Sequence, residues 1–112
     1  MSDRRQVPRY IAEFHGQVAQ PPGAPPHTVT LVNLSVSGCS LEGAGSLKPG
    51  QHCEITFERE GQQFRAEAAV TWKSSKGEAG MKFLYVSPAD QEVLKKVCAT
   101  LRLQPLIRRV EE

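Results

Sequence analysis

The sequence predicts a mainly all-β protein, a six-stranded antiparallel β-barrel with a C-terminal α-helix packed outside it. Three observations lead to this fold class. Polar and apolar residues alternate in several segments, turn-forming residues separate them, and the 3.6-residue period of a helix appears only near the C-terminal end. The 112 residues correspond to one ordinary domain, so we expect a single unit over 1–112 with a flexible arginine arm (1–9), a barrel (10–86) and a helix (87–103).

Three of the expected strands lie in the N-terminal part of the chain. The segment from Tyr10 to Val18 alternates between two faces, as a strand with one buried face does. The segment from Thr28 to Leu34 is β-branched and mostly apolar, and Cys39 to Leu41 is the shortest strand. Between the first two strands, Gln20 to His27 holds four of the eight prolines and is therefore expected to be an extended loop.

The other three strands follow in the second half of the chain. Cys53 to Phe57 and Phe64 to Trp72 alternate regularly on either side of Glu60-Gly61, which predicts a β-hairpin. In this alternation Trp72 belongs to the inward-facing set, so we expect it to pack in the core rather than stack on a ligand. The segment from Met81 to Tyr85 forms the sixth strand, in which every second residue is apolar.

A single helix is expected to follow the strands. Ser87 is a favourable N-cap, Pro88 suits the first helical position, and Asp90 is an acid in the first turn. Pro105 should end the helix. Between the cap and this proline, apolar residues recur at helical spacing and form one stripe that faces the barrel or a partner: Leu94, Val97, Cys98 and Leu101.

Composition favours a soluble, cytoplasmic protein. The chain is 39% hydrophobic and has no apolar run near the roughly 18 residues that span a bilayer. Its first residues, Met-Ser-Asp-Arg-Arg, lack the apolar stretch of a secretory signal. The three cysteines are odd in number and include no Cys-x-x-Cys pair, which favours reduced thiols over a disulfide framework.

The net charge of +2 is too small to indicate a nucleic-acid partner by itself, but the charge is unevenly distributed. Residues 1–10 carry three arginines and one acid, and residues 95–109 carry five basic residues and no acid, whereas the middle of the chain is acidic. The N-terminal arginines are either a solvated tail or an arm that holds an anion, and composition alone leaves both interpretations open.

Catalytic and metal-binding patterns are largely absent, so we expect a protein that is not an enzyme and that uses no cofactor. The sequence has no Gly-x-Ser-x-Gly elbow, no His-Glu-x-x-His and no phosphate-binding Gly-x-x-x-x-Gly-Lys. His52 and Cys53 are neighbours that point to opposite faces of one strand, which disfavours a shared metal. A thiol with a lowered pKa would make Cys39 a nucleophile, but a small buried hydrophobe is the commoner role.

Two short segments together have the chemistry of a purine-nucleotide site. The first, Arg4-Arg5-Gln6-Val7-Pro8-Arg9, precedes the first strand, and the second, Asn33-Leu34-Ser35-Val36-Ser37-Gly38, lies where the second strand ends. Arginine can donate two hydrogen bonds to guanine O6 and N7, stack on a base and pair with phosphate. The amide of Asn33 can accept from guanine N–H groups, the hydroxyl of Ser35 can bond phosphate or ribose, and Gly38 permits a close approach.

The combination Arg5-x-x-x-Arg9 and Asn33-x-Ser35-x-x-Gly38 resembles the paired signature of PilZ domains, a family that binds the bacterial second messenger cyclic di-GMP. The late segments 69–72 and 80–83 also resemble the family's last hairpin, and the segment from Ser87 onward resembles its terminal helix, so the resemblance covers nearly the whole chain. Asn33 stands where aspartate is common in the family, which removes a charge from the acceptor that faces guanine.

The resemblance implies a role for each matching residue. Arg5 and Arg9 would grip guanine and phosphate with help from Arg4, and Asn33 and Ser35 would hold the polar edge of the other guanine. Gly38 would keep the surface open, and Gly80 would let the ligand lie close to its strand. The implied function is a cyclic di-GMP receptor that orders its arginine arm on binding and signals to a protein effector.

Two other functions remain open at this point. The chain can be a PilZ-like protein-interaction module with weak or no ligand binding, acting through its helix and basic C-terminal end. It can also be a small RNA- or DNA-binding barrel, but five of its seven aromatic residues are assigned to core faces, and such platforms need exposed aromatic side chains. We therefore expect cyclic di-GMP and a protein effector as partners, and no DNA, RNA or membrane segment.

Overall fold

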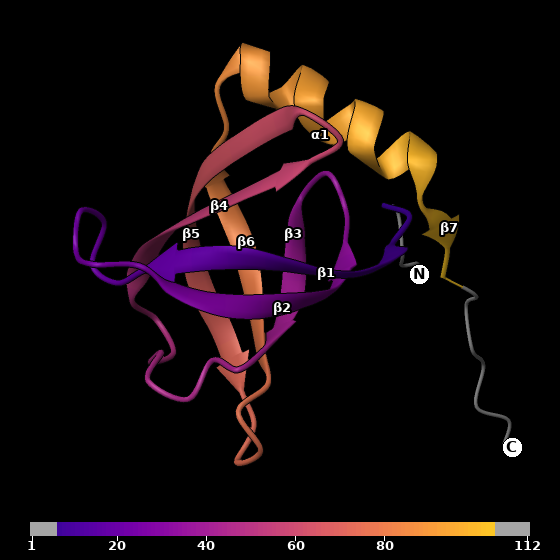
Figure 1. Cartoon of the computed structure of the whole chain (residues 1–112). Coiled ribbons are helices and arrows are strands. Elements are labelled where there is room, and N and C mark those ends of the chain that lie inside the picture. The colour runs from indigo at the N-terminus through magenta and orange to yellow at the C-terminus, as the bar shows by residue number, and fades with distance from the viewer. Residues whose placement is uncertain (1–6, 105–112) are drawn as a thin grey trace, which may run out of the picture.

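A computed structural model describes residues 7–104 of the chain and shows a β-barrel with one helix lying across its end (Figure 1). The elements in chain order are β1 (Tyr10–Ala19), β2 (His27–Leu34), β3 (Gly38–Glu42), β4 (His52–Arg59), β5 (Gln62–Lys73), β6 (Ala79–Tyr85), α1 (Pro88–Thr100) and β7 (Arg102–Leu103). The six expected strands and the expected helix are all present. The two-residue β7 was not expected, because two residues carry no periodic signal.

The strands pair in the order β2-β3-β6-β5-β4-β1, and β1 also pairs with β2, so the sheet closes on itself. All of these pairings are antiparallel. The predicted six-stranded antiparallel barrel is therefore confirmed. The extra strand β7 pairs antiparallel with the first residues of β1 and lies beside the barrel wall.

The alternation in the sequence places one face of each strand in a common core. β4 and β5 bury every second residue and are joined at Glu60-Gly61, where both residues have positive φ, 54° and 81°. Two positive φ values are what a two-residue hairpin turn of type I′ requires, so the predicted hairpin is confirmed. Phe57 and Phe64 face each other across this hairpin with their rings 4.8 Å apart at the centroids.

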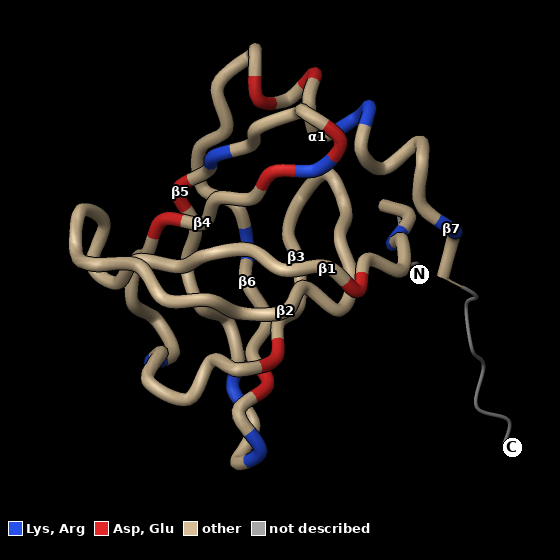
Figure 2. The backbone as a smooth tube through the Cα atoms, in the orientation of Figure 1, with Lys and Arg blue, Asp and Glu red and all other residues tan. Residues whose placement is uncertain are grey.

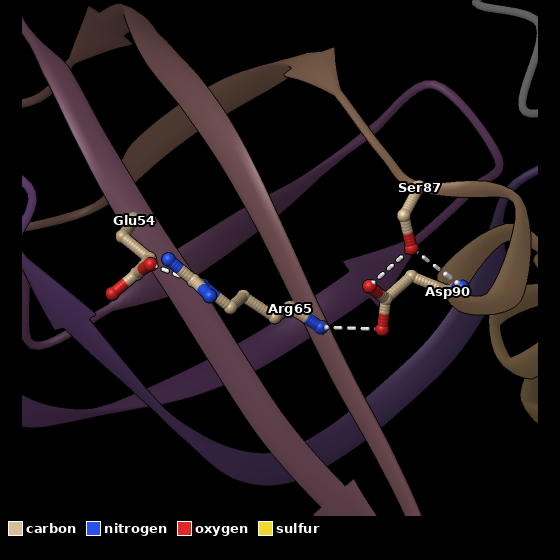
Figure 3. Close-up of polar contacts among 4 residues, drawn as sticks. All are labelled: Glu54, Arg65, Ser87 and Asp90. Atoms are coloured by element: carbon tan, nitrogen blue, oxygen red, sulfur yellow. Dashed lines mark hydrogen bonds and ion pairs between the residues drawn. The ribbon is translucent and has the colours of Figure 1, made fainter.

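The helix begins as predicted and packs its apolar stripe on the barrel. The Oγ of Ser87 accepts a hydrogen bond from the N–H of Asp90 at 3.1 Å and donates one to the Asp90 carboxylate at 2.7 Å (Figure 3). The other carboxylate oxygen of Asp90 accepts from the N–H of Arg65 at 3.1 Å, which ties the helix start to β5. The side chain of Arg65 forms an ion pair with Glu54 of β4. The helix buries Leu94, Val97 and Cys98.

The helix ends earlier than the expected residue 103. Leu101 turns the backbone to an extended conformation (φ −99°, ψ 157°), and its N–H donates to the carbonyl of Cys98 at 3.1 Å. Arg102 and Leu103 then pair with β1. The stop is therefore set by the tertiary pairing with β1, and it precedes Pro105.

The prediction that Trp72 packs in the core is wrong, because a β-bulge interrupts the alternation of β5. Val70 pairs with Met81 and Trp72 pairs with Gly80, so Thr71 is an extra residue opposite no partner in β6. A bulge of this kind shifts the following side chains to the other face. Trp72 is consequently 48% exposed on the outer wall of the barrel. A second bulge in β6 likewise leaves Tyr85 60% exposed.

Candidate functional site

One row of directly opposed residues crosses the outer wall of the barrel. Ile11 of β1 is paired with Asn33 of β2, and Asn33 is paired with Ser40 of β3. Ser40 is paired with Gly80 of β6, and Gly80 with Trp72 of β5. Because residues directly opposite each other in antiparallel strands place their side chains on the same face, five strands contribute to one surface strip.

Two bulges turn the polar and aromatic members of this row outward. Leu31 is fully buried, and in a regular strand Asn33, two residues later, would share its inward face. The pairings skip one residue between Leu31 and Asn33, as they do between Val70 and Trp72. A β-bulge therefore turns both Asn33 and Trp72 toward the outside of the barrel, and such bulges are common beside functional sites.

Four members of this row, Asn33, Ser40, Gly80 and Trp72, line a groove of about 830 Å3. Five of the predicted site residues line this groove: Arg9, Asn33, Ser35, Gly38 and Gly80. The other two, Arg4 and Arg5, lie outside the described residues. The rest of the groove is lined by residues that the sequence did not predict as ligand-binding: Val7, Ser37, Cys39, Ser40, Thr71, Trp72, Met81 and Lys82.

Ser35 builds the turn that forms one side of the groove. Its Oγ accepts hydrogen bonds from the N–H groups of Ser37 and Gly38, both at 3.1 Å, and lies 3.2 Å from the carbonyl oxygen of Gly38. Its own N–H donates to that carbonyl at 2.8 Å. A serine hydroxyl that bonds the backbone two and three residues ahead fixes a turn. Ser35 is only 6% exposed, so its geometry supports positioning of this loop more than direct contact with a ligand.

The two glycines are required by neighbours that lie too close for a side chain. A Cβ on Gly38 would stand 2.1 Å from the backbone oxygen of Met81, so glycine allows β3 and β6 to pair here. A Cβ on Gly80 would stand 2.0 Å from Nε1 of Trp72. The indole therefore rests directly on the backbone of Gly80. Thr71 supports the same bulge by donating from Oγ1 to the carbonyl of Gly80 at 3.2 Å.

Positive charge reaches the groove from two sides. Arg9 lies at its edge, and the N–H of Gln104 donates to the Arg9 carbonyl at 2.8 Å, which fixes the backbone at the base of the arginine arm. Lys82 is exposed on β6 directly opposite Gly38. The alternation of β6 predicts that Lys82 points outward, but only the pairing of β6 with β3 shows that it lies beside the Asn33–Gly38 turn.

The three cysteines are free and buried thiols. Burial raises the pKa of Cys53 and of Cys98 to about 11. Burial also raises the pKa of Cys39, and the neighbouring Cys53 raises it further. Cys39 lines the groove but stays protonated at neutral pH, so it is unsuited to nucleophilic attack. Among residues 7–104 no group of three or more His, Cys, Asp or Glu side chains could hold a metal ion.

A second groove of about 750 Å3 lies on another part of the wall, between β1, β4 and β5. Its lining includes His15, Gln63, Arg65 and Asp90, and none of the predicted site residues. In the described part of the chain, no helix is long and apolar enough to cross a membrane.

The closed antiparallel barrel thus carries a groove that is lined by β2, β3, β5, β6 and the segment before β1 and that includes two basic residues, Arg9 and Lys82. The chain belongs to the PilZ domain family, whose family model matches residues 3–100. PilZ domains are in general ligand-binding receptor domains rather than enzymes. The resemblance carried by the two sequence motifs is therefore confirmed at the level of the family.

Solved structures share the fold at low sequence identity. The PilZ domain of YcgR from Escherichia coli, solved with c-di-GMP, has a TM-score of 0.68 and 20% identity over 88% of this chain and 92% of that chain. The Bacillus subtilis inhibitor of motility MotI has a TM-score of 0.68 and 19% identity over 88% of this chain; the match covers 51% of MotI, about half its length. PlzA of Borreliella burgdorferi, solved in complex with c-di-GMP, has a TM-score of 0.62 and 12% identity over 86% and 41% of the two chains. The search of curated proteins found no match.

Proposed function

We propose that this domain is a receptor for cyclic di-GMP that binds the ligand without chemical conversion. The observation that carries the proposal is the groove, which gathers Arg9, Asn33 and the Ser35–Gly38 turn from distant parts of the chain onto one surface. Family members solved with c-di-GMP support the choice of ligand.

The groove offers a distinct contact for each part of the ligand. Arg9 presents a planar fork that suits guanine O6 and N7 or a phosphate, and Lys82 supplies a second cation for phosphate. The amide oxygen of Asn33 can accept from the N–H groups of a guanine. The exposed half of the Trp72 indole is a flat apolar surface on which a guanine can stack, as bases do on aromatic side chains.

The outer arginines complete the proposed site. Arg4 and Arg5 precede Arg9 by five and four residues, and Arg9 is fixed at the edge of the groove. We propose that ligand phosphates and guanines give these side chains charge-assisted partners, each worth about 1.5–3 kcal/mol, and so order residues 1–9 against the turn. The ordered arm would then be the surface that a protein effector in the cytoplasm recognises.

Limited trypsin digestion tests the ordering step. Cleavage after Arg4 and Arg5 should slow when cyclic di-GMP saturates the protein, whereas cleavage in the loop after Lys76, far from the arginine arm in sequence, serves as the internal reference. Equal slowing at both places would indicate global stabilisation, and no slowing at Arg4 and Arg5 would show that the arm does not close.

Calorimetric titration tests the choice of ligand. Cyclic di-GMP should bind with micromolar or better affinity, and GMP and cyclic di-AMP should bind much more weakly, because adenine offers an amino donor where guanine offers O6. Equal affinity for cyclic di-AMP would contradict the assignment of guanine. Absence of binding by all three would favour the alternative, a PilZ-like module that acts through protein contacts alone.

A further inference from the structure

The unexpected strand β7 places an arginine at the end of the row of opposed residues, beyond the four members that line the groove. Arg102 is paired with Ile11, and Ile11 is paired with Asn33. The row of directly opposed residues that begins at Trp72 therefore continues beyond Asn33, across β1, to Arg102. Figure 2 shows the basic position of β7 beside the start of β1.

The pairing fixes the face on which Arg102 lies. Directly opposed residues share a face, so Arg102 is on the same outer face as Ile11 and Asn33. Adjacent strands are about 4.8 Å apart, which puts the Cα of Arg102 about 10 Å from that of Asn33 with one residue between them. Arginine has a long stem, so its guanidinium can extend over Ile11 toward the groove. The residue is exposed, and its side chain is free of the core.

The same strand brings Arg102 close to Arg9. Gln104 donates to the Arg9 carbonyl, so these two residues are opposite each other and Arg102 is the diagonal neighbour of Arg9. Diagonal neighbours of this kind have backbones about 7–8 Å apart and are within reach of long side chains. Two cations at this spacing repel each other in the free protein, and an anion between them relieves the repulsion.

We propose that Arg102 is a further ligand-binding residue, which contacts a phosphate of the bound dinucleotide from the side opposite Lys82. The inference rests on the proposed function and deepens it. It assigns a role to β7, which lies beyond the residues 3–100 that the family model matches. The site is then assembled from distant parts of the chain, since Arg9 before β1 and Arg102 after α1 contact the same anion.

Titration of matched charge variants with cyclic di-GMP tests this proposal. Arg102→Ala should weaken binding about tenfold and reduce the loss of affinity on raising the salt concentration, because one ion pair with phosphate is gone. Lys96→Ala removes the same charge from an exposed position of α1 and should change affinity less than twofold. Arg102→Lys should recover part of the affinity. All three variants should melt within a few degrees of the wild type, since both positions are exposed.

The outcomes separate this inference from the proposed function. If Arg9→Ala weakens binding and Arg102→Ala binds like the wild type, the role of Arg102 is refuted and the receptor function stands. If Arg102→Ala and Lys96→Ala weaken binding equally, the effect is long-range charge and the contact is again refuted. If the wild type does not bind cyclic di-GMP, both proposals fail.

Discussion

Replacing Gly80 by alanine should weaken cyclic di-GMP binding without unfolding the barrel. The new Cβ would stand 2.0 Å from Nε1 of Trp72, and ordinary van der Waals contact begins at 3.4 Å, so the indole must retreat by about 1.4 Å. The indole is free to do so because Trp72 is 48% exposed. The substitution therefore moves the proposed stacking surface and leaves the strand pairing in place.

The expected magnitudes for binding and for stability differ. Stacking of a base on an aromatic side chain contributes about 1–3 kcal/mol, so loss of this contact should raise Kd about 5- to 150-fold. Stability should change by less than about 1 kcal/mol, because alanine also lowers the entropy of the unfolded chain. Gly38→Ala, in contrast, should mainly lower the stability of the fold. Its Cβ meets the Met81 backbone oxygen at 2.1 Å, and a clash with backbone should cost about 3 kcal/mol of folding free energy.

Intrinsic fluorescence is a direct assay, because Trp72 is the only tryptophan in the chain. Fluorescence titration and thermal melting should be compared for the wild type, Gly80→Ala and Gly38→Ala. Gly45→Ala is the matched control, since a Cβ there meets nothing within 4 Å. Wild-type affinity in Gly80→Ala, together with a shifted Trp72 emission spectrum, would refute the stacking role. A loss of stability as large as that of Gly38→Ala would refute the claim that the clash is absorbed by the indole.

Three other predictions concern the groove and the core. Arg9→Ala should raise the Kd for cyclic di-GMP about 5- to 150-fold, the loss of about 1–3 kcal/mol for a bidentate guanine contact, with no change in melting temperature; a large drop in melting temperature with binding retained would make Arg9 structural. Asn33→Asp should keep or strengthen binding in calorimetry, because a carboxylate accepts stronger hydrogen bonds from guanine; a tenfold loss would show that this position faces phosphate. At pH 8 the three thiols should react with a disulfide reagent only as fast as the protein unfolds, because burial raises the pKa of Cys53 and Cys98 to about 11 and also raises the pKa of Cys39. Rapid labelling of one thiol in the folded protein would contradict this burial.

Much of the barrel could be predicted from local pattern. The alternation in β4 and β5 and the Glu60-Gly61 turn define a hairpin within one short stretch of chain, and the structure confirms it. The start of α1 is likewise encoded locally, because the Ser87 cap bonds a group only three residues away. Features that depend on neighbours in sequence are the ones that the sequence specifies most directly.

The position of Trp72 could not be predicted in this way. In the sequence, Trp72 alternates regularly with Val70. Trp72 faces outward only because a β-bulge between these two residues shifts the pairing of β5 with β6 by one residue. Asn33 shows the same effect. Leu31, two residues earlier, is buried, and regular alternation would place Asn33 in the core as well. The motif identified the correct residue, but the bulge that turns it outward is a property of the paired strands.

Contacts between segments far apart in the chain could not be predicted from the sequence either. Lys82 reaches the groove because it is opposite Gly38, which lies 44 positions earlier in the chain. The pairing of Arg102 with Ile11 joins the two ends of the described chain. Neither pairing produces a pattern in the neighbouring sequence. The charge distribution therefore showed only that both terminal segments are basic.

Amide chemical-shift mapping with cyclic di-GMP tests the location of the site most directly. The central claim predicts that the largest shifts fall on the groove, at the amides of Asn33, Gly38 and Gly80, at the single indole N–H of Trp72, and at the amide of Arg9. If these shifts all follow the same saturation curve as ligand is added, the dinucleotide binds where the two motifs meet. Shifts concentrated instead at His15, Gln63 and Arg65 would place the ligand in the second groove, and no shifts at millimolar ligand would contradict the receptor function altogether.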